Sequence, residues 1–343
     1  MVGVAVIGAG YWGPNLVRNI QATPQLRLIS LCDLDLSRAQ AVLGRYSTVR
    51  ATSSLQEVLA DPEVDAVAVA TPAATHLEVA LAAIEAGKHV LVEKPLAASH
   101  ADGLKLVGAA EERGLVLMLD HTFCYTPEVQ RLRRLVHDGE LGELQYVDSV
   151  RINLGLVQPD IDVLWDLAPH DLSILDAILP PGVRPVAVAA HGSDPAALGR
   201  ACVAYLSAQL SNGAIAHAHL NWLSPTKIRT TIVGGSRRTA VWNDLDRTMP
   251  LAIYDRGVDW PDGQDRRVSY RIGDMVAPAL PVGEALRAVM AEFAAAIIEG
   301  RPALTDGRSG LRVLAQLEAA SASLATGGVF VPVANGAMDG GAA

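Results

Sequence analysis

The sequence predicts an α/β fold in two parts, a doubly wound parallel sheet over residues 1–120 and an α+β domain over residues 121–333. The first prediction rests on a glycine-rich turn after an apolar strand, and on strands that alternate with capped helices up to residue 120. The second rests on a change in the connections between strands, because turns and not helices join the later strands, as in an open, mostly antiparallel sheet. Residues 334–343 are rich in glycine and alanine, and we expect a flexible tail there.

The glycine-rich turn follows the apolar run 4–7 and reads Gly8-Ala9-Gly10-Tyr11-Trp12-Gly13, with Pro14 next. The three glycines permit a tight turn, close approach of a pyrophosphate to the backbone, and close packing of the next helix. Pro14 suits the first turn of that helix, whose free N–H groups can bind phosphate. The pattern is typical of a dinucleotide-binding Rossmann domain.

The second strand, Leu26–Cys32, ends at Asp33, twenty residues beyond Gly13. A carboxylate at this place can accept hydrogen bonds from the adenosine ribose hydroxyls and repels a 2′-phosphate. The sequence therefore favours NAD over NADP. Arg38 keeps NADP open as the alternative, because a guanidinium so near in sequence could meet the extra phosphate.

The remaining elements are predicted from apolar periodicity and capping residues. In the first domain we expect helices from Ser37 to Tyr46, after Ser54, from Thr75 to Gly87 and from Ser99 to Gly114, and strands over Ala66–Ala70, His89–Val92 and Leu115–Leu119. In the second we expect helices over Pro127–Gly139, Glu284–Glu299 and Ser309–Ala325, and strands over Leu144–Asn153, Cys202–Leu210, Ala214–Trp222, Lys227–Val233, Thr239–Trp242, 251–254 and 268–272.

Composition narrows the class of protein. A net charge of −9 without a basic run argues against a nucleic-acid surface. No apolar run approaches the ~18 residues of a membrane helix, and Met1 leads directly into the first strand, so we expect a cytoplasmic protein without membrane contact. The three cysteines lack CxxC spacing, and His217-Ala218-His219 reads better as a half-buried sheet face than as a metal site, so no metal is predicted.

Two groups of residues are candidates for chemistry. Lys94 is a cation at the end of a central strand, although an exposed salt-bridge lysine is an equal reading. Asp166 is placed near a helix N-cap because Pro169 is tolerated only near a helix start, and His170 then lies one turn on, on the same face. A carboxylate beside an imidazole suits proton transfer, whereas the alternative is a capping aspartate and a structural histidine.

Together these motifs resemble the Gfo/Idh/MocA family of oxidoreductases. The resemblance rests on the Gly8 loop, Asp33, the run Thr71-Pro72-Ala73-Ala74-Thr75-His76, Glu93-Lys94-Pro95, and the D-x-x-x-H motif from Asp166 to His170. It implies that His170 is the acid/base, that Lys94 contacts the nicotinamide ribose and the substrate hydroxyl, and that Asp166 holds the adjacent hydroxyl. It also implies subunit pairing through the open sheet, as a homodimer or homotetramer.

The resemblance assigns the cofactor-binding residues by motif, and the substrate-binding candidates follow from expected proximity. The cofactor set is Gly8, Gly10, Tyr11, Trp12, Gly13, Asp33, Thr71, Pro72, His76, Glu93 and Lys94. The candidate substrate set, chosen by expected proximity, is His121, Tyr125, Arg151, Asn153, Trp165, Lys227 and Arg229.

The sequence departs from the family pattern in two places and points to a subgroup in others. Within the D-x-x-x-H motif, Ala168-Pro169 replaces a common pair of small residues. The glycine run that often precedes the D-x-x-x-H motif is replaced by Asp162-Val163-Leu164-Trp165. The glycine-loop and motif variants resemble members that oxidise or reduce a sugar at C3, such as UDP-N-acetylglucosamine 3-dehydrogenases. We therefore expect a sugar or cyclitol oxidoreductase, with a redox-silent NAD- and sugar-binding regulator or an NAD-dependent glycosidase as alternatives.

Overall fold

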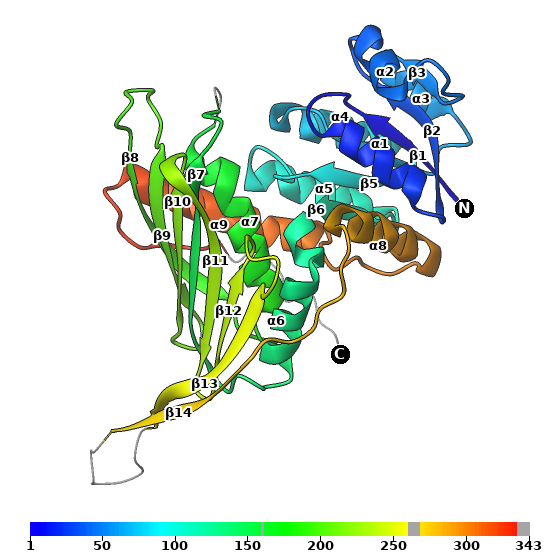
Figure 1. The fold of residues 1–343 in the computed structure, drawn as a ribbon. Helices are drawn as coiled ribbons and strands as arrows, with labels where there is room; N and C mark the ends of the chain where they lie inside the picture. Colours follow the sequence, from blue (N-terminus) through cyan, green and yellow to red (C-terminus); the bar gives the residue numbers. More distant parts are fainter. Residues whose placement is uncertain (159–160, 260–267, 335–343) are drawn as a thin grey trace. The chain divides into compact units, whose positions relative to one another are not determined.

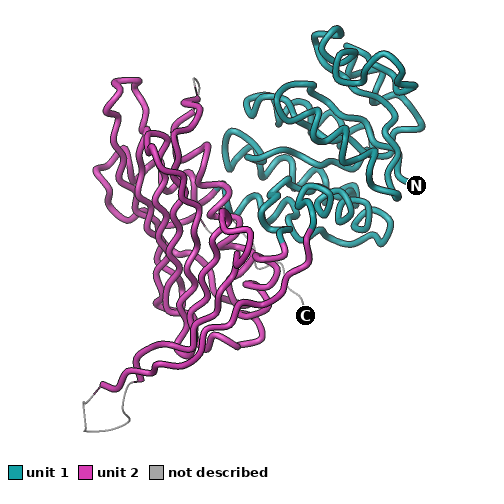
Figure 2. Tube along the Cα trace, in the orientation of Figure 1, with its two compact units in different colours: residues 1–126, 283–314 teal, residues 127–282, 315–343 magenta. Residues whose placement is uncertain are grey.

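The computed structural model describes residues 1–158, 161–259 and 268–334, and divides into two compact units (Figure 2). Unit 1 contains residues 1–126 and 283–314, and unit 2 contains residues 127–282 and 315–343. The predicted single boundary at residue 120 differs from this division, because a later segment returns to unit 1. Most of the expected tail, residues 335–343, lies outside the described residues.

Unit 1 is built on a six-stranded parallel sheet in the order β3-β2-β1-β4-β5-β6, which confirms the doubly wound prediction (Figure 1). Its strands are β1 Val2–Ile7, β2 Leu26–Cys32, β3 Arg50–Thr52, β4 Ala66–Val69, β5 His89–Glu93 and β6 Leu117–Asp120. Its helices are α1 Gly13–Ala22, α2 Leu36–Leu43, α3 Leu55–Ala60, the 3₁₀ turn η1 Ala73–Thr75, α4 His76–Glu85, α5 His100–Glu112, the 3₁₀ turn η2 Thr122–Tyr125 and α8 Ala285–Glu299. The central strands β1 and β4 are fully buried, as their unbroken apolar runs require.

The late segment is attached to unit 1 by polar contacts with α1. Glu284, the residue before α8, accepts hydrogen bonds from both terminal nitrogens of Arg18, at 2.7 and 2.5 Å, and from Asn19 at 3.1 Å. These contacts lower the pKa of Glu284 to about 2. Sequence periodicity predicts α8 but carries no signal for this long-range pairing.

The helix caps differ in part from those expected. The helix predicted from Ser99 is present as α5, and Ser99 caps it, since its Oγ accepts the N–H of Asp102 at 3.1 Å. The α2 helix is capped by Asp35 rather than Ser37, because the Asp35 carboxylate reaches two N–H groups of the first turn. Thr75 makes no cap, since its hydroxyl instead donates to Pro72 O and Thr71 Oγ1, both at 2.8 Å.

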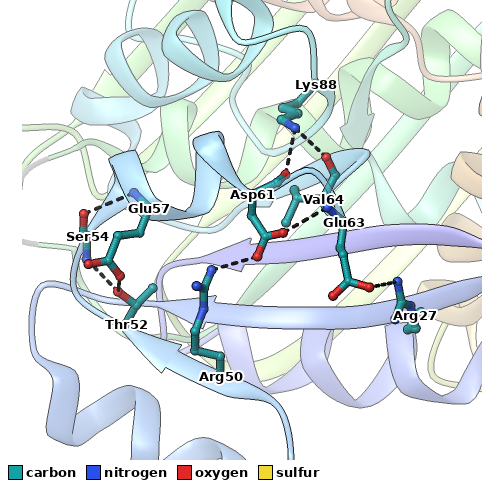
Figure 3. A network of polar contacts seen from close by, with 9 residues as sticks. All are labelled: Arg27, Arg50, Thr52, Ser54, Glu57, Asp61, Glu63, Val64 and Lys88. Atoms are coloured by element: carbon teal, nitrogen blue, oxygen red, sulfur yellow. Dashed lines mark hydrogen bonds and ion pairs between the residues drawn. The ribbon is translucent and has the colours of Figure 1, made fainter.

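Polar side-chain contacts lie along β3, the edge strand of the unit 1 sheet, and along the loop before β4 (Figure 3). Ser54 caps α3 by accepting the N–H of Glu57 at 3.2 Å, and the Glu57 carboxylate accepts the Thr52 hydroxyl at 2.8 Å. Lys88 donates to the carbonyl oxygens of Asp61 and Val64 at 3.1 and 2.7 Å. Side-chain hydrogen bonds therefore hold the sheet edge and the connection into β4.

Unit 2 is built on a nine-stranded mixed sheet in the order β14-β13-β12-β11-β7-β10-β9-β8-β15 (Figure 1). Its strands are β7 Leu144–Leu154, β8 Pro185–Ser193, β9 Val203–Leu210, β10 Ile215–Asn221, β11 Leu223–Gly235, β12 Thr239–Asn243, β13 Leu251–Asp259, β14 Ser269–Val276 and β15 Val331–Pro332. The β7 and β10 strands pair in parallel, and the other pairs are antiparallel, which confirms the mostly antiparallel prediction. Sequence patterns missed β8, β15 and the three-residue β3.

The helices of unit 2 include α6 Pro127–His137 and α7 Val163–Ile178, and the unit boundary falls within α9 Gly307–Ala325. Figure 1 shows α7 along one face of the sheet, where Leu206 of β9 and Ala216 and Ala218 of β10 are buried. The alternation of buried and exposed residues along β9 follows the period of two that a sheet covered on one face requires. Among the described helices, none is long and apolar enough to cross a membrane.

Candidate active site

The glycine-rich loop of unit 1 has the geometry of a phosphate cradle. Gly8 has φ of +104°, and a Cβ there would lie 2.5 Å from the Ala70 carbonyl oxygen. A Cβ at Gly13 would lie 2.2 Å from the Gly8 carbonyl oxygen, whereas at Gly10 no atom lies within 4 Å. The α1 helix has no side-chain cap and no acidic residue in its first turn. Its N–H groups can therefore bind the pyrophosphate of a dinucleotide approaching over Gly10.

Asp33 follows β2 and supports this loop directly. Its Oδ2 accepts the Ala9 N–H at 2.7 Å, and its Oδ1 accepts the Asp35 N–H at 2.9 Å. The carboxylate retains lone pairs for ribose hydroxyls, as NAD binding requires. Arg38 Nη1 lies 3.8 Å from Asp33 Oδ1, and the Arg38 side chain is 55% exposed, so it can turn toward a 2′-phosphate.

We expect Asp33→Ala to weaken NAD binding and to improve NADP binding relative to NAD. The substitution removes the ribose acceptor together with the charge that repels a 2′-phosphate. The double variant Asp33→Ala/Arg38→Ala should lose the relative gain for NADP, because Arg38 is the cation beside Asp33. Fluorescence titration with both cofactors measures the ratio. A parent protein that binds NADP more tightly than NAD would contradict the expectation.

His76 ties two loops together at the carboxyl ends of β4 and β5. Its ring is 1% exposed, with Nδ1 2.8 Å from Pro95 O and Nε2 2.9 Å from Thr71 O. Burial lowers the pKa of His76 more than the two carbonyls raise it, so a neutral ring donates to one of them. The expected direct cofactor contact is therefore replaced by a positioning role for His76, whereas Thr71 and Pro72 remain partly exposed or exposed in the loop it anchors.

Glu93, Lys94 and His121 come together at the ends of β5 and β6. His121 is 1% exposed, and burial, with the Lys94 charge as a further cause, lowers its pKa to about 3. Neither ring nitrogen of His121 has a hydrogen-bond partner among the described residues. A neutral imidazole with unused nitrogens beside a lysine suits contact with a polar ligand. The Lys94–Pro95 peptide bond is cis.

Two aromatic residues of the expected site differ in their surroundings. Tyr11 is 93% exposed and stacks on Trp12, with the ring centroids 6.3 Å apart. Tyr125 is buried, and its hydroxyl lies 2.8 Å from Thr305 Oγ1 within unit 1. Burial raises the pKa of Tyr125. We therefore reassign Tyr125 from substrate contact to the packing of the segment that carries Thr305.

In unit 2, α7 carries Asp166 and His170 one turn apart on the same face, and both are half-buried. The helix begins earlier than predicted, since Asp162 is its N-cap and accepts the Trp165 N–H at 2.9 Å. Pro169 therefore lies inside the helix and not in its first turn, because the Asp162 cap adds a turn before it.

Trp222 fixes the Asp166 carboxylate. The indole is 1% exposed, and its Nε1 donates to Asp166 Oδ2 at 2.9 Å. Asn153 of β7 lies beside the same indole, since a Cβ on Gly155 would lie 3.1 Å from Asn153 Nδ2 and 3.4 Å from Trp222 Cδ1. Sequence reasoning did not identify Trp222, because nothing in its spacing from Asp166 indicates the contact.

The polar groups of Arg151 and Trp165 form hydrogen bonds within unit 2. Arg151 is 4% exposed, and its Nε and Nη2 donate to the Asp171 carboxylate at 2.7 and 3.2 Å. The expected role in neutralising a substrate phosphate is therefore corrected, because a buried carboxylate already neutralises this charge. Trp165 donates its indole N–H to Ser321 Oγ at 2.9 Å, so this polar group is committed to α9.

The remaining expected residues lie on the unit 2 sheet. Lys227 is exposed on β11, and Arg229 is half-buried with Nη1 3.1 Å from Asp244 Oδ2. His217 and His219 share a sheet face with Tyr205, whose ring centroid lies 4.5 Å from that of His219. Within the described part of the chain, no group of three or more His, Cys, Asp or Glu residues is arranged to hold a metal ion.

Comparison with known proteins agrees with these features. Residues 2–121 match the model of the oxidoreductase family with an NAD-binding Rossmann fold, and residues 129–240 match the GFO/IDH/MocA C-terminal domain. The chain is 33% identical over 317 residues to UDP-N-acetylglucosamine 3-dehydrogenase of Acidithiobacillus ferrooxidans, covering 90% of this chain and 93% of that enzyme. A structure of that enzyme has a TM-score of 0.81 at 31% identity and covers 95% of this chain and 99% of its own.

Two further relatives are informative. GenD2 from gentamicin A biosynthesis, solved in complex with NAD, has a TM-score of 0.80 at 27% identity, covering 97% of this chain and 96% of its own. D-glucoside 3-dehydrogenase of Escherichia coli is 35% identical over 149 residues, 43% of this chain and 42% of that enzyme. With the glycine loop, Asp33 and the two family matches in place, the chain belongs to the Gfo/Idh/MocA family of oxidoreductases and carries its NAD-binding domain.

Proposed function

We propose that the protein interconverts a secondary alcohol and a ketone on a sugar or cyclitol with NAD, and that its substrate is oxidised at C3 of a nucleotide sugar or aminosugar. The observation that carries this proposal is the similarity to a UDP-N-acetylglucosamine 3-dehydrogenase along 90% of the chain. The D-glucoside 3-dehydrogenase relative supports oxidation at C3, and GenD2, which was solved in complex with NAD, supports the cofactor.

In the proposed chemistry each candidate residue has its own role. When bound, NAD supplies the hydride acceptor. His170 would take the hydroxyl proton, and Asp166, oriented by the Trp222 indole, would hold a neighbouring hydroxyl. The Lys94 ammonium would stabilise negative charge on the substrate oxygen as the proton leaves. His121, neutral and buried beside Lys94, supplies a polar contact without a competing positive charge.

A substrate panel tests the proposal. The protein is incubated with NAD and, separately, with nucleotide sugars, free aminosugars, glucosides and inositols, while NADH absorbance is followed. NADH formation with UDP-N-acetylglucosamine or a related nucleotide sugar, and a 3-keto product by mass spectrometry, supports the full proposal. NADH formation only with inositols or free sugars leaves the oxidoreductase and overturns the nucleotide-sugar substrate.

The same panel separates the two alternative classes. A glycosidase that uses transient oxidation would release a free sugar from a glucoside without net NADH. A redox-silent regulator would bind NAD and a sugar, detected by calorimetry, without forming either product. Either result would overturn the dehydrogenase proposal.

If the substrate is a nucleotide sugar, Lys227 is the cation most available to its pyrophosphate, because it is exposed whereas Arg229 is paired with Asp244. We expect Lys227→Ala to raise KM for the nucleotide sugar about ten-fold, the value of one hydrogen bond to a charged group. KM for the corresponding free sugar should stay near that of the parent. The exposed Lys105→Ala variant in unit 1 is the matched control. Equal effects of Lys227→Ala on both substrates would overturn the pyrophosphate contact.

A further inference from the structure

The ends of β5 and β6 bring two carboxyl groups together beside the glycine-rich loop. Glu93 pairs with Asp120 in the parallel register, which places the two carboxyl side chains next to each other on the same side of the sheet. Asp120 is buried, and two ionised carboxylates side by side in such a place repel each other unless one of them takes up a proton. One of the two therefore carries a proton.

The surrounding donors identify which carboxyl is ionised. Asp120 is 2% exposed, its Oδ2 accepts the Trp12 indole N–H at 3.2 Å, and its Oδ1 accepts the Thr122 hydroxyl at 2.7 Å. Glu93 Oε1 is inaccessible to solvent and has no donor among the described residues. Both oxygens of Asp120 thus accept hydrogen bonds from other side chains, whereas Glu93 Oε1 has no such donor, so the proton is placed on Glu93.

We propose that Glu93 and Asp120 share one proton, with Glu93 as the neutral acid, and that this pair positions Trp12 in the cofactor-binding loop. Trp12 is the N-cap residue of α1 and lies between the glycines of the loop. Its indole N–H donates to Asp120, the last residue of β6, and this hydrogen bond joins the loop to that strand. The pair thus links the conformation of the loop to the charge at the ends of β5 and β6.

The charged neighbours agree with this assignment. Burial raises the pKa of Glu93 well above its ordinary range, the Asp120 charge adds to the rise, and Lys94 opposes it. His121 is neutral, because burial, with the Lys94 charge as a further cause, lowers its pKa to about 3. Tyr11, which is exposed, stacks on the Trp12 indole. The carboxyl group that accepts the Trp12 indole N–H is therefore that of Asp120, and the proton of the pair lies on Glu93.

The first test is spectroscopic and needs no substrate. At neutral pH the infrared spectrum of the parent should contain the C=O stretching band of a protonated carboxylic acid, and Glu93→Gln should lack it. Asp120→Asn should lose the band at a lower pH than the parent, because the charge that favours the proton is gone. The exposed Glu112→Gln variant on α5 should keep the band unchanged. A parent without the band, or Glu93→Gln with it, overturns the proposal.

Stability against pH gives a second readout. An unfolded glutamate loses its proton near pH 4.3, and the folded Glu93 keeps it to a higher pH. Between the pKa of the unfolded glutamate and that of the folded Glu93, unfolding releases this proton. The folding equilibrium constant of the parent, relative to that of Glu93→Gln, should therefore fall by about ten-fold per pH unit in this range. A ratio that does not change with pH would contradict a shared proton.

Cofactor affinity tests the positioning role. Trp12→Phe removes the indole N–H, and we expect it to raise the Kd for NAD about ten-fold. Glu93→Ala should weaken NAD binding similarly, because Asp120 loses a hydrogen-bond donor. The amide of Glu93→Gln can still donate, so the affinity of this variant should stay within about three-fold of the parent at pH 7. Affinity of the parent should fall at alkaline pH more than that of Glu93→Gln. If Glu93→Gln binds NAD as poorly as Glu93→Ala, Glu93 acts as a carboxylate and the proposal fails.

Discussion

Replacing His170 with alanine should lower kcat roughly 10²- to 10⁴-fold, the contribution of a positioned proton-transfer group. The Kd for NAD should change little, because the glycine loop and Asp33 belong to unit 1 and His170 belongs to unit 2. In the direction of alcohol oxidation, kcat/KM of the parent should fall as the pH is lowered, since a protonated imidazole cannot accept the hydroxyl proton. Stopped-flow measurement of NADH formation and NAD titration separate these effects.

The controls for His170 use another histidine and the lysine. His191→Ala, on the exposed part of β8, should keep parental kcat. Lys94→Ala should also be severely slow, and Lys94→Arg should remain impaired, because a guanidinium keeps the charge but places its donors differently. A His170→Ala protein with near-parental turnover and an unchanged pH profile would exclude His170 as the base. Lys94 and the neutral His121 would then be the residues to replace next.

The predictions that succeeded concern residues whose local sequence fixes their conformation. The apolar run before Gly8 predicts β1, and the spacing to Asp33 predicts a carboxylate at the end of β2, where its Oδ2 now accepts the Ala9 N–H at 2.7 Å. A glycine with φ of +104° leaves little choice of residue type, so the loop can be read from the sequence. Period-two alternation likewise placed Arg151 and Asn153 on one face of β7.

The predictions that failed depend on contacts between residues far apart in the chain. Trp222 and Asp166 are separated by 56 residues, and Trp12 and Asp120 by 108, so no motif indicates either hydrogen bond. Arg151 looked like a phosphate ligand because a lone arginine on a strand gives no sign of its partner. Asp171, next to His170 on α7, is that partner, and only the packing of α7 on β7 shows it.

The second large effect is expected from this buried ion pair. The Arg151 and Asp171 side chains are 5% and 4% exposed, and the Ser149 hydroxyl donates to the same carboxylate at 2.5 Å. Removing one partner leaves an uncompensated buried charge, so Asp171→Asn and Arg151→Met should each lower the free energy of unfolding of unit 2 by about 3–5 kcal/mol. Urea denaturation followed by circular dichroism measures the change, taken at the transition that involves unit 2.

Two comparisons make this test decisive. Glu63→Gln removes an ion pair with Arg27 whose side chains are 62% and 52% exposed, and it should cost less than about 1 kcal/mol. The double variant Arg151→Met/Asp171→Leu removes both charges and should recover much of the stability lost by either single change, because no unpaired charge remains buried. A substrate-binding Arg151 predicts a different pattern, in which Arg151→Met raises KM while stability is kept. If the Arg151–Asp171 ion pair instead holds α7 against β7, both single variants should lose stability. Activity should then fall as well, because α7 carries Asp166 and His170.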